Sequence, residues 1–241
     1  MTAVSPDLLV AAVVAFAVFT QSLTGFGSGM VCMSVLPGVL GIRVASPLVA
    51  LVMCTVEAVL LLRYRHALKV GAVWRMWSGA FVGIPVGIAA LRHVDEHLII
   101  GVLGLVLVGY SLYALRAPRL PELEHPGWAY GAGLLGGVLG GAYNSGGPPA
   151  IIYGHSRRWT PHEFKSNLQA LFLVMDVMVI AGHAAGGNFT PVVWGHYMHA
   201  LPAAALGAVA GLALDRRIDH RLFSRIVLWW LLVMGIRLLV R

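Results

Sequence analysis

Two glycine-rich segments interrupt apolar stretches of this chain, about half its length apart. The first covers residues 23–29 and reads LTGFGSG, and the second covers residues 140–149 and reads GGAYNSGGPP. In lipid every backbone N–H and C=O needs a partner, so a helix breaks at membrane depth only inside protein or beside a water-filled cavity. Paired broken segments in related halves of a chain indicate the binding site of a transporter. The two interruptions therefore predict an internal site, provided that the chain spans a membrane.

Composition supports a membrane location. Of the 241 residues, 59% are hydrophobic and 11% are charged, whereas a soluble domain carries about 25% charged residues. Several apolar runs reach the length of about 20 residues that a spanning helix needs. The net charge of +7 lies in short segments between these runs, so topology and lipid headgroups explain it better than nucleic acid does. We predict an all-α, polytopic membrane protein whose partners include the lipid bilayer and no nucleic acid.

The two halves of the chain align with each other after a shift of 120 residues. The shift pairs Gly27 with Gly147 (147 − 27 = 120) and Trp74 with Trp194 (194 − 74 = 120), and it brings the two interruptions together. The aligned tryptophans and glycines indicate an internal duplication. A single membrane transport domain is therefore expected over residues 1–241.

The duplication divides that domain into repeat one (7–115), a proline-rich and charged linker (116–126) and repeat two (127–241). Each repeat is expected to hold one interrupted stretch and three ordinary spans. The interrupted stretches cover residues 8–41 and 127–155, and the spans cover residues 44–62, 72–91, 98–115, 167–184, 192–214 and 222–240.

Positive charge distinguishes two topologies. If each interrupted stretch crosses the membrane once, the basic residues divide almost evenly between the two sides. If each stretch instead dips in, turns at its glycines and returns, one side collects most basic residues, in segments 63–75, 116–119, 157–165 and 216–225. Cytoplasmic loops carry an excess of Lys and Arg. We therefore predict two inverted repeats, each with one re-entrant broken-helix hairpin plus three transmembrane helices, with both termini outside and the hairpins meeting near the midplane.

The glycine-rich turns have the chemistry of an oxyanion site. Glycine permits close backbone approach, and a restarting helix presents free N–H groups and partial positive charge, which bind anions. Side chains such as Thr24 and Asn144 are expected to add hydrogen-bond donors. The predicted substrate-binding residues are Thr24, Gly25, Gly27, Ser28, Gly29, Asn144, Ser145, Gly146, Gly147 and Gln169. Helix packing on small residues is the competing explanation of the glycines, although it does not account for Asn144 or for the two prolines that follow.

At these residues the chain resembles the TauE/SafE sulfite exporter family. Segment 21–31 (QSLTGFGSGMV) is similar to the first-half motif of that family, and segment 136–153 (GGVLGGAYNSGGPPAIIY) is similar to its more specific second motif. Segment 159–176 resembles the stretch that follows. The resemblance covers nearly the whole chain. It departs at Asn144 and Ser145, where relatives often carry Gly and Thr or similar small residues.

The resemblance implies a secondary transporter that exports sulfite or a related small sulfur-containing anion across a bacterial inner membrane without a cofactor. Some members are linked to sulfoacetate or other organic anions, so the exact substrate does not transfer. The alternative is a channel-like or uptake permease for another small anion or organic acid, because direction cannot be read from sequence. The oligomeric state stays open, with a homo-oligomer included.

Two carboxylates fall inside apolar stretches, Glu57 and Asp176. Such residues are costly in lipid and are candidates for proton relays. A carboxylate beside an anion site repels its ligand unless it is protonated, so both residues are candidates for proton coupling. A neutral, hydrogen-bonded structural acid is the alternative. His183, near the outer end of its span, is expected to be a satisfied interfacial histidine.

An intramembrane enzyme is a further class. Ser28, flanked by glycines, would need a base within hydrogen-bond reach, and His155 is the nearest candidate. We predict no enzyme. Two histidine pairs, His93 with His97 and His196 with His199, have the spacing of metal ligands but no evident third ligand. No metal site is therefore predicted. No nucleotide-binding loop occurs in the sequence, so ATP is not the expected driving force.

Overall fold

The structure, a computed structural model, describes residues 6–116, 121–215 and 217–240, and every regular element in these ranges is helical. Residues 117–120 of the predicted linker lie outside the described residues. The helices are α1 (Pro6–Thr24), α2 (Ser28–Val35), α3 (Pro37–Leu40), α4 (Ile42–Tyr64), the 3-10 turn η1 (Arg65–Ala67), α5 (Val70–His93), α6 (Glu96–Arg116), α7 (Gly127–Tyr143), α8 (Gly147–Ser156), α9 (Pro161–Ala185), α10 (Pro191–Leu214) and α11 (His220–Val240). The predicted all-α class is confirmed.

Within the described residues, seven helices are long and apolar enough to cross a membrane: α1, α4, α5, α6, α9, α10 and α11. The polytopic membrane protein is therefore confirmed. Each predicted span lies within one of these helices. The largest difference is at α9, which begins at Pro161 rather than at residue 167. Thr160 and Glu163 form a capping box there, and Pro161 occupies the first helical position, so the helix starts earlier than hydrophobicity alone indicates.

Both interruptions break a helix. Between α1 and α2, Gly25 and Gly27 adopt positive φ angles of 86° and 102°, a conformation that favours glycine. Between α7 and α8, Asn144 caps the helix at a φ of 49°, which an asparagine side chain tolerates better than most. The helices on either side of the first break are not the two short arms of a hairpin that crosses half of a membrane. One of them, α1, has 19 residues, and the chain after α2 continues through the four-residue α3.

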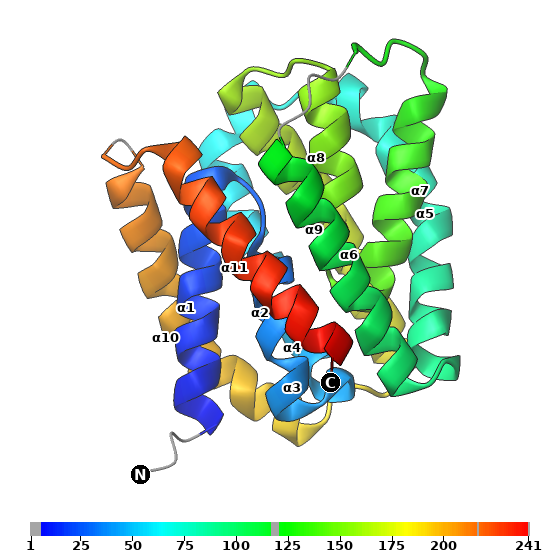
Figure 1. The fold of residues 1–241 in the computed structure, drawn as a ribbon, viewed down its shortest axis with the longest axis vertical. Coiled ribbons are helices and arrows are strands. Elements are labelled where there is room, and N and C mark those ends of the chain that lie inside the picture. Colours follow the sequence, from blue (N-terminus) through cyan, green and yellow to red (C-terminus); the bar gives the residue numbers. More distant parts are fainter. Residues whose placement is uncertain (1–5, 117–120, 216, 241) are drawn as a thin grey trace.

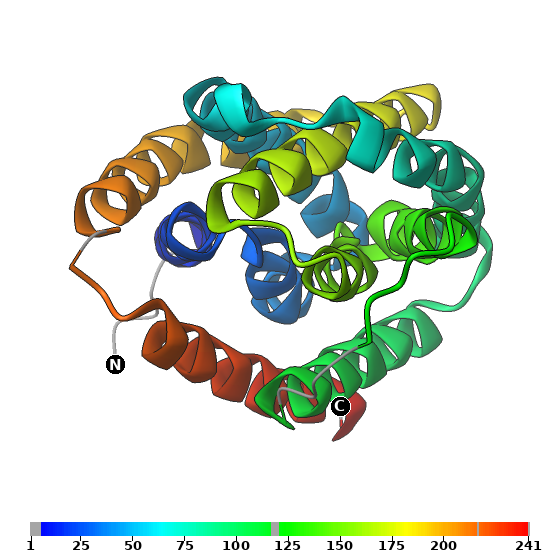
Figure 2. The same cartoon turned by 90° about the horizontal axis from the view of Figure 1, so that it is seen from above.

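The chain runs back and forth between two ends of the molecule (Figure 1). The connections from α4 to α5, from α8 to α9 and from α10 to α11 lie at the upper end of this view. The start of α1 and the end of α11 both lie at the lower end, and α7 runs downward where α1 runs upward. Seen from above, α2 and α8 lie near the centre, with α6 and α11 along one side and α4 and α9 along the other (Figure 2).

Helices of one half pack closely on helices of the other. A Cβ atom on Gly83 of α5 would lie 2.2 Å from the carbonyl oxygen of Leu134 in α7, and one on Gly207 of α10 would lie 2.3 Å from the carbonyl oxygen of Ala15 in α1. Small residues allow this close approach of helix backbones in a membrane. In the predicted duplication α5 corresponds to α10 and α1 corresponds to α7. The pairs α5–α7 and α10–α1 are then equivalent contacts between the halves, as an inverted duplication requires, and that duplication stays a prediction.

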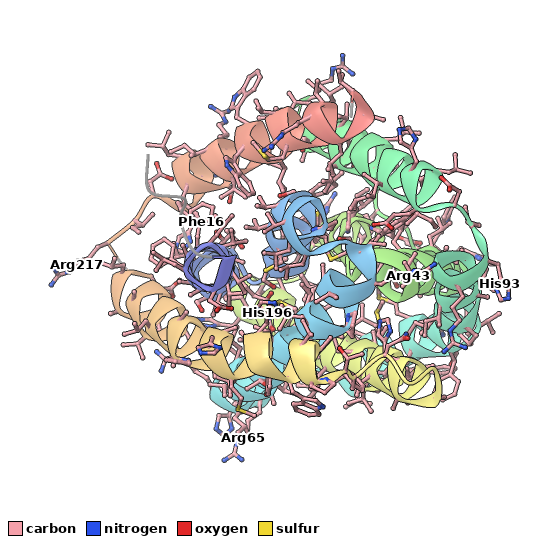
Figure 3. All side chains as sticks on the ribbon, turned by 90° about the horizontal axis from the view of Figure 1, so that it is seen from below. Phe16, Arg43, Arg65, His93, His196 and Arg217 are labelled. Carbon is pink, nitrogen blue, oxygen red and sulfur yellow. The ribbon has the colours of Figure 1, made fainter. Side chains whose placement is uncertain are left out.

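Basic side chains extend into solvent at the upper end of Figure 1. Arg65, in η1, and Arg217, between α10 and α11, are exposed, and both project outward at the rim when the molecule is viewed from below (Figure 3). These residues belong to the segments that the charge pattern assigns to the cytoplasmic side.

Candidate functional site

A buried cavity lies where the two glycine-rich turns meet. Its volume is about 30 Å³, room for about two water molecules. The cavity is lined by Gln21, Gly27, Ser28, Gly29, Met30, Met53, Glu57, Gly140, Asn144, Ser145, Gly146, Gly147, Phe172, Met175 and Asp176. The turns themselves are in contact, because a Cβ atom on Gly29 would lie 2.0 Å from the carbonyl oxygen of Asn144. The two turns can therefore approach each other this closely only with glycine at position 29.

Two helices begin at the cavity. The first backbone bond of α2 runs from the Val31 N–H to the Gly27 carbonyl oxygen, so the N–H groups of residues 28–30 have no acceptor within the helix. Gly146 and Gly147 stand in the corresponding place at the start of α8. Both helix starts direct partial positive charge at the same small space, which is an arrangement that binds anions.

Two carboxyl groups share the cavity with these helix starts. Glu57 of α4 and Asp176 of α9 are 3% and 8% exposed, and their carboxyl groups lie close enough to interact. Glu57 Oε2 and Asp176 Oδ2 have no hydrogen-bond partner among the described residues. None of the residues that line the cavity is basic. Two ionised carboxylates in contact away from water would repel each other.

A glutamine bridge, made by Gln21, Gln169 and the Gly25 carbonyl, holds the first turn. Gln21 Nε2 donates to Gln169 Oε1 (2.9 Å) and to Glu57 Oε1 (3.5 Å), and Gln169 Nε2 donates to the Gly25 carbonyl oxygen (2.8 Å). Ser28 Oγ donates to Gln21 Oε1. The bridge therefore joins the first turn, the carboxyl pair and α9 in one hydrogen-bonded network.

An asparagine anchor, made by Asn144, Ser46 and His183, holds the second turn. Asn144 Nδ2 donates to the carbonyl oxygen and to the Oγ of Ser46, at 2.9 and 3.0 Å. His183 Nδ1 faces Asn188 Nδ2 at 2.9 Å; an amide nitrogen only donates, so His183 carries its proton on Nε2 and donates to Ser46 Oγ at 3.2 Å. His183 is 1% exposed and both its ring nitrogens are hydrogen-bonded, as expected of a satisfied histidine, while its position at the membrane interface stays a prediction.

The side-chain donors expected at the two turns are engaged within the protein. Thr24 Oγ1 lies 2.7 Å from the carbonyl oxygen of Phe26, and Ser145 Oγ donates to the carbonyl oxygen of Tyr143 at 3.0 Å. Ser28 and Asn144 donate to Gln21 and Ser46, as described above. The expectation that these four side chains supply donors to a ligand is therefore corrected. The donors left at the cavity are backbone N–H groups.

Most of the predicted substrate-binding residues line the cavity. These are Gly27, Ser28, Gly29, Asn144, Ser145, Gly146 and Gly147, and the predicted proton-coupling residues Glu57 and Asp176 join them. Thr24, Gly25 and Gln169 lie beside the cavity and are not among its lining residues. A Cβ atom on Gly25 would lie 2.9 Å from Lys165 Cγ, and Lys165 is itself paired with Asp215 at 2.8 Å.

Sequence reasoning missed Gln21 as a site residue. A lone amide side chain in the apolar helix α1, seven residues before Ser28, was a usable signal, because buried polar groups need partners. The serine considered as a nucleophile has Gln21 Oε1 as its acceptor, and an amide oxygen is no general base. His155 stacks instead on Phe164, with ring centroids 4.8 Å apart.

Seven candidate spans and two broken-helix turns around a buried polar cavity define a multi-pass membrane protein with an internal site. The chain belongs to the sulfite exporter TauE/SafE family, whose model matches residues 10–238. It is therefore a membrane transporter of that family.

Two curated relatives agree with this assignment. A "Probable sulfite/organosulfonate exporter TauE" from Cupriavidus necator is 28% identical over 206 residues, which cover 80% of this chain and 78% of the relative. A "Probable inner membrane transporter protein TsaS" from Comamonas testosteroni is 25% identical over 169 residues, which cover 69% of this chain and 71% of the relative. No solved structure matches the chain significantly.

Proposed function

We propose that this protein is a secondary transporter that exports sulfite or a related small sulfur-containing oxyanion across the bacterial inner membrane through the cavity between the two turns. One observation carries the proposal. The starts of α2 and α8 share a buried cavity with two carboxyl groups, Glu57 and Asp176, and with no basic residue. Helix starts supply the positive field for an anion, and the carboxyl pair supplies a site for a proton.

The size of the cavity supports a compact substrate. A volume of about 30 Å³ suits a small oxyanion better than a long-chain sulfonate. The name of the Cupriavidus necator relative includes both sulfite and organosulfonate, and the cavity favours the smaller of these. The partners of the protein are then the small anion and the lipid bilayer. No catalytic role follows, because Ser28 has an amide acceptor in place of a base.

Charge determines how a proton and an anion combine at this site. An ionised carboxylate repels an anion in a space of low dielectric constant, so anion binding is strongest while Glu57 and Asp176 hold a proton. A dianion that moves with one proton carries one net negative charge. An inside-negative potential favours its exit by about 2.3 kcal/mol per 100 mV. The proposed coupling is therefore compatible with export.

The topology proposed here is the inverted one. The basic connections at the upper end of Figure 1 face the cytoplasm, and both termini face outward. Each hairpin then enters from the side opposite to the other, and both turns reach the cavity. Alternating exposure of this cavity to the two sides would move the substrate without a continuous pore.

Sulfite flux in proteoliposomes tests the proposal, with the membrane potential and the pH gradient imposed separately. We expect saturable flux in the wild-type protein, and in Asp176→Asn and Glu57→Gln a loss of the response to the pH gradient. The matched control is Asp219→Asn, on the exposed turn before α11. The backbone N–H groups of Arg221 and Leu222 hold the pKa of the Asp219 carboxyl below its usual range, so it stays ionised at neutral pH and carries no coupled proton.

If flux in the wild-type protein responds to the membrane potential and not to the pH gradient, transport is not coupled to protons. Non-saturable flux would favour the channel-like alternative. No flux of sulfite under any gradient, from protein shown to be folded, would refute the substrate assignment.

A further inference from the structure

Asn144 lines the cavity, and hydrogen bonds to Ser46 fix the orientation of its side-chain amide. Its side-chain nitrogen donates to the Ser46 carbonyl oxygen, and a carbonyl oxygen can only accept. The amide therefore cannot turn over without placing two acceptors against each other. Asn144 Oδ1 is buried and has no partner among the described residues, and Asn144, which is 9% exposed, lines the cavity.

The asparagine anchor maintains this orientation from behind. His183 Nε2 donates to Ser46 Oγ at 3.2 Å, and Asn188 in turn donates to His183 Nδ1. Ser46 Oγ thus accepts hydrogen bonds from both Asn144 and His183. Ser46 lies in α4, His183 in α9 and Asn144 at the end of α7. The position of Asn144 is therefore determined by tertiary structure as well as by the turn.

An unpartnered buried oxygen costs free energy unless a ligand satisfies it. A ligand that satisfies it carries an O–H group as well as the anionic oxygens that the backbone N–H groups of α2 and α8 attract. We propose that the site selects the protonated, monovalent form of the oxyanion, hydrogensulfite in the case of sulfite, and that Asn144 Oδ1 is the specificity-determining acceptor for its hydroxyl group. This inference rests on the proposed transport function and narrows its substrate class.

The carboxyl pair does not replace Asn144 in this role. Each carboxyl group can turn its proton toward or away from a ligand, and so it can act as donor or as acceptor. Asn144 Oδ1 has only one function available to it. A site that hydrogen-bonds a substrate hydroxyl rejects analogues that lack it, because its own polar group is then left unpaired.

Methanesulfinate is the matched probe, since it replaces the hydroxyl of hydrogensulfite by a methyl group and keeps the SO₂ group and the charge. Both ions are offered to wild-type proteoliposomes, separately and in competition. We expect hydrogensulfite to be transported with an apparent affinity roughly 10- to 100-fold higher. Methanesulfonate, which also lacks the hydroxyl, is expected to be a poor substrate as well.

The variant Asn144→Gly tests the residue. Glycine accepts the positive φ of this position without strain, so the turn is retained while the acceptor is removed. The preference for hydrogensulfite over methanesulfinate is expected to fall to within about threefold, since the variant has no acceptor that methanesulfinate would leave unpaired. The control is Ser111→Ala in α6, which removes a buried hydroxyl group outside the cavity and should keep the wild-type preference.

Equal transport of hydrogensulfite and methanesulfinate by the wild-type protein would overturn this inference and leave the transport function standing. A full preference retained in Asn144→Gly would remove Asn144 from the role. Transport of none of the three anions by folded protein would refute the proposed function and this inference together. The wild-type comparison does not depend on the folding of any variant.

Discussion

The two glycine-rich turns of this protein have the same architecture and different chemistry. Each breaks a helix, begins a second one at the cavity and is bound to a long helix. The first turn is bound by the glutamine bridge, in which Gln169 of α9 reaches the Gly25 carbonyl. The second is bound by the asparagine anchor, in which Ser46 of α4 accepts from Asn144. Two turns of similar architecture are therefore stabilised by different polar contacts.

The difference separates two tasks. The glutamine bridge reaches Glu57 through Gln21, so it connects the first turn with the carboxyl group proposed to carry a proton. The asparagine anchor leads away from the carboxyl pair to a buried histidine, and it fixes one neutral acceptor. One turn is thus tied to charge and the other to the recognition of neutral polar groups. Three changes test this division, in order of decreasing expected effect.

The largest effect is expected where the turns touch. Gly29→Ala places a Cβ atom against the Asn144 carbonyl oxygen, so the turns must separate. We expect the free energy of unfolding to fall by about 1–3 kcal/mol and transport to be lost. In Gly101→Ala, where a Cβ atom has no heavy atom within 4 Å, we expect a gain of about 0.5–1 kcal/mol. Chemical denaturation in detergent measures both. Equal stability of the two variants would show that the turns are not in contact.

An intermediate effect separates the two networks. Gln169→Leu removes two hydrogen bonds between different elements, and each is worth about 0.6 kcal/mol, at most about 1.7, in a membrane protein. We expect a loss of about 1–2 kcal/mol. Ser46→Ala removes the hydroxyl that accepts from both Asn144 and His183, but Asn144 keeps its main-chain acceptor. The main loss is then the His183 bond, which is expected to cost about 0.6 kcal/mol.

Thr55→Val is the control for this pair of variants. It removes one hydrogen bond between helices, to the Tyr197 hydroxyl, and one within α4, to the Leu51 carbonyl oxygen, away from both turns. Thermal and chemical unfolding of the three variants give the comparison. If Ser46→Ala were more damaging than Gln169→Leu, the ranking of the two networks would be reversed.

The smallest effect lies outside the cavity. Lys69 pairs with Glu163 at the start of α9, with a Lys69 side chain that is 64% exposed. An exposed ion pair contributes about 0–1 kcal/mol, so Lys69→Met should change stability by less than about 0.5 kcal/mol, and less still in high salt. Glu163→Ala also breaks the capping box and should cost about 1 kcal/mol. Equal effects of the two changes would argue against the capping box.

The sequence predicts the backbone of this site better than its side chains. The positions of both breaks, the helical class and the two membrane carboxylates follow from glycine content and hydrophobicity. The start of α9 was also predictable, since Thr160, Pro161 and Glu163 form a recognisable capping signal. What a side chain faces depends on the neighbouring helix, and no local pattern specifies that neighbour.

Three residues illustrate the limit. Asn144 was expected to donate to a ligand, but tertiary contact with Ser46 uses its donor and leaves its acceptor without a partner among the described residues. Gln169 was expected to bind substrate, and it lies against the first turn. His183 was expected to be satisfied, but the sequence did not identify its partners, Ser46 and Asn188. In each case the role of the side chain depends on a hydrogen-bond partner in another part of the structure.

The most direct test of the central claim is to locate the anion itself. Selenite has the shape and charge of sulfite and a strong anomalous signal, so a crystal structure of the protein grown with selenite locates it without ambiguity. Our account predicts a selenium peak in the cavity, next to the first N–H groups of α2 and α8 and within hydrogen-bond distance of Asn144 Oδ1. If selenite competes with sulfite for transport and its peak lies away from this cavity, the two turns do not form the transport site.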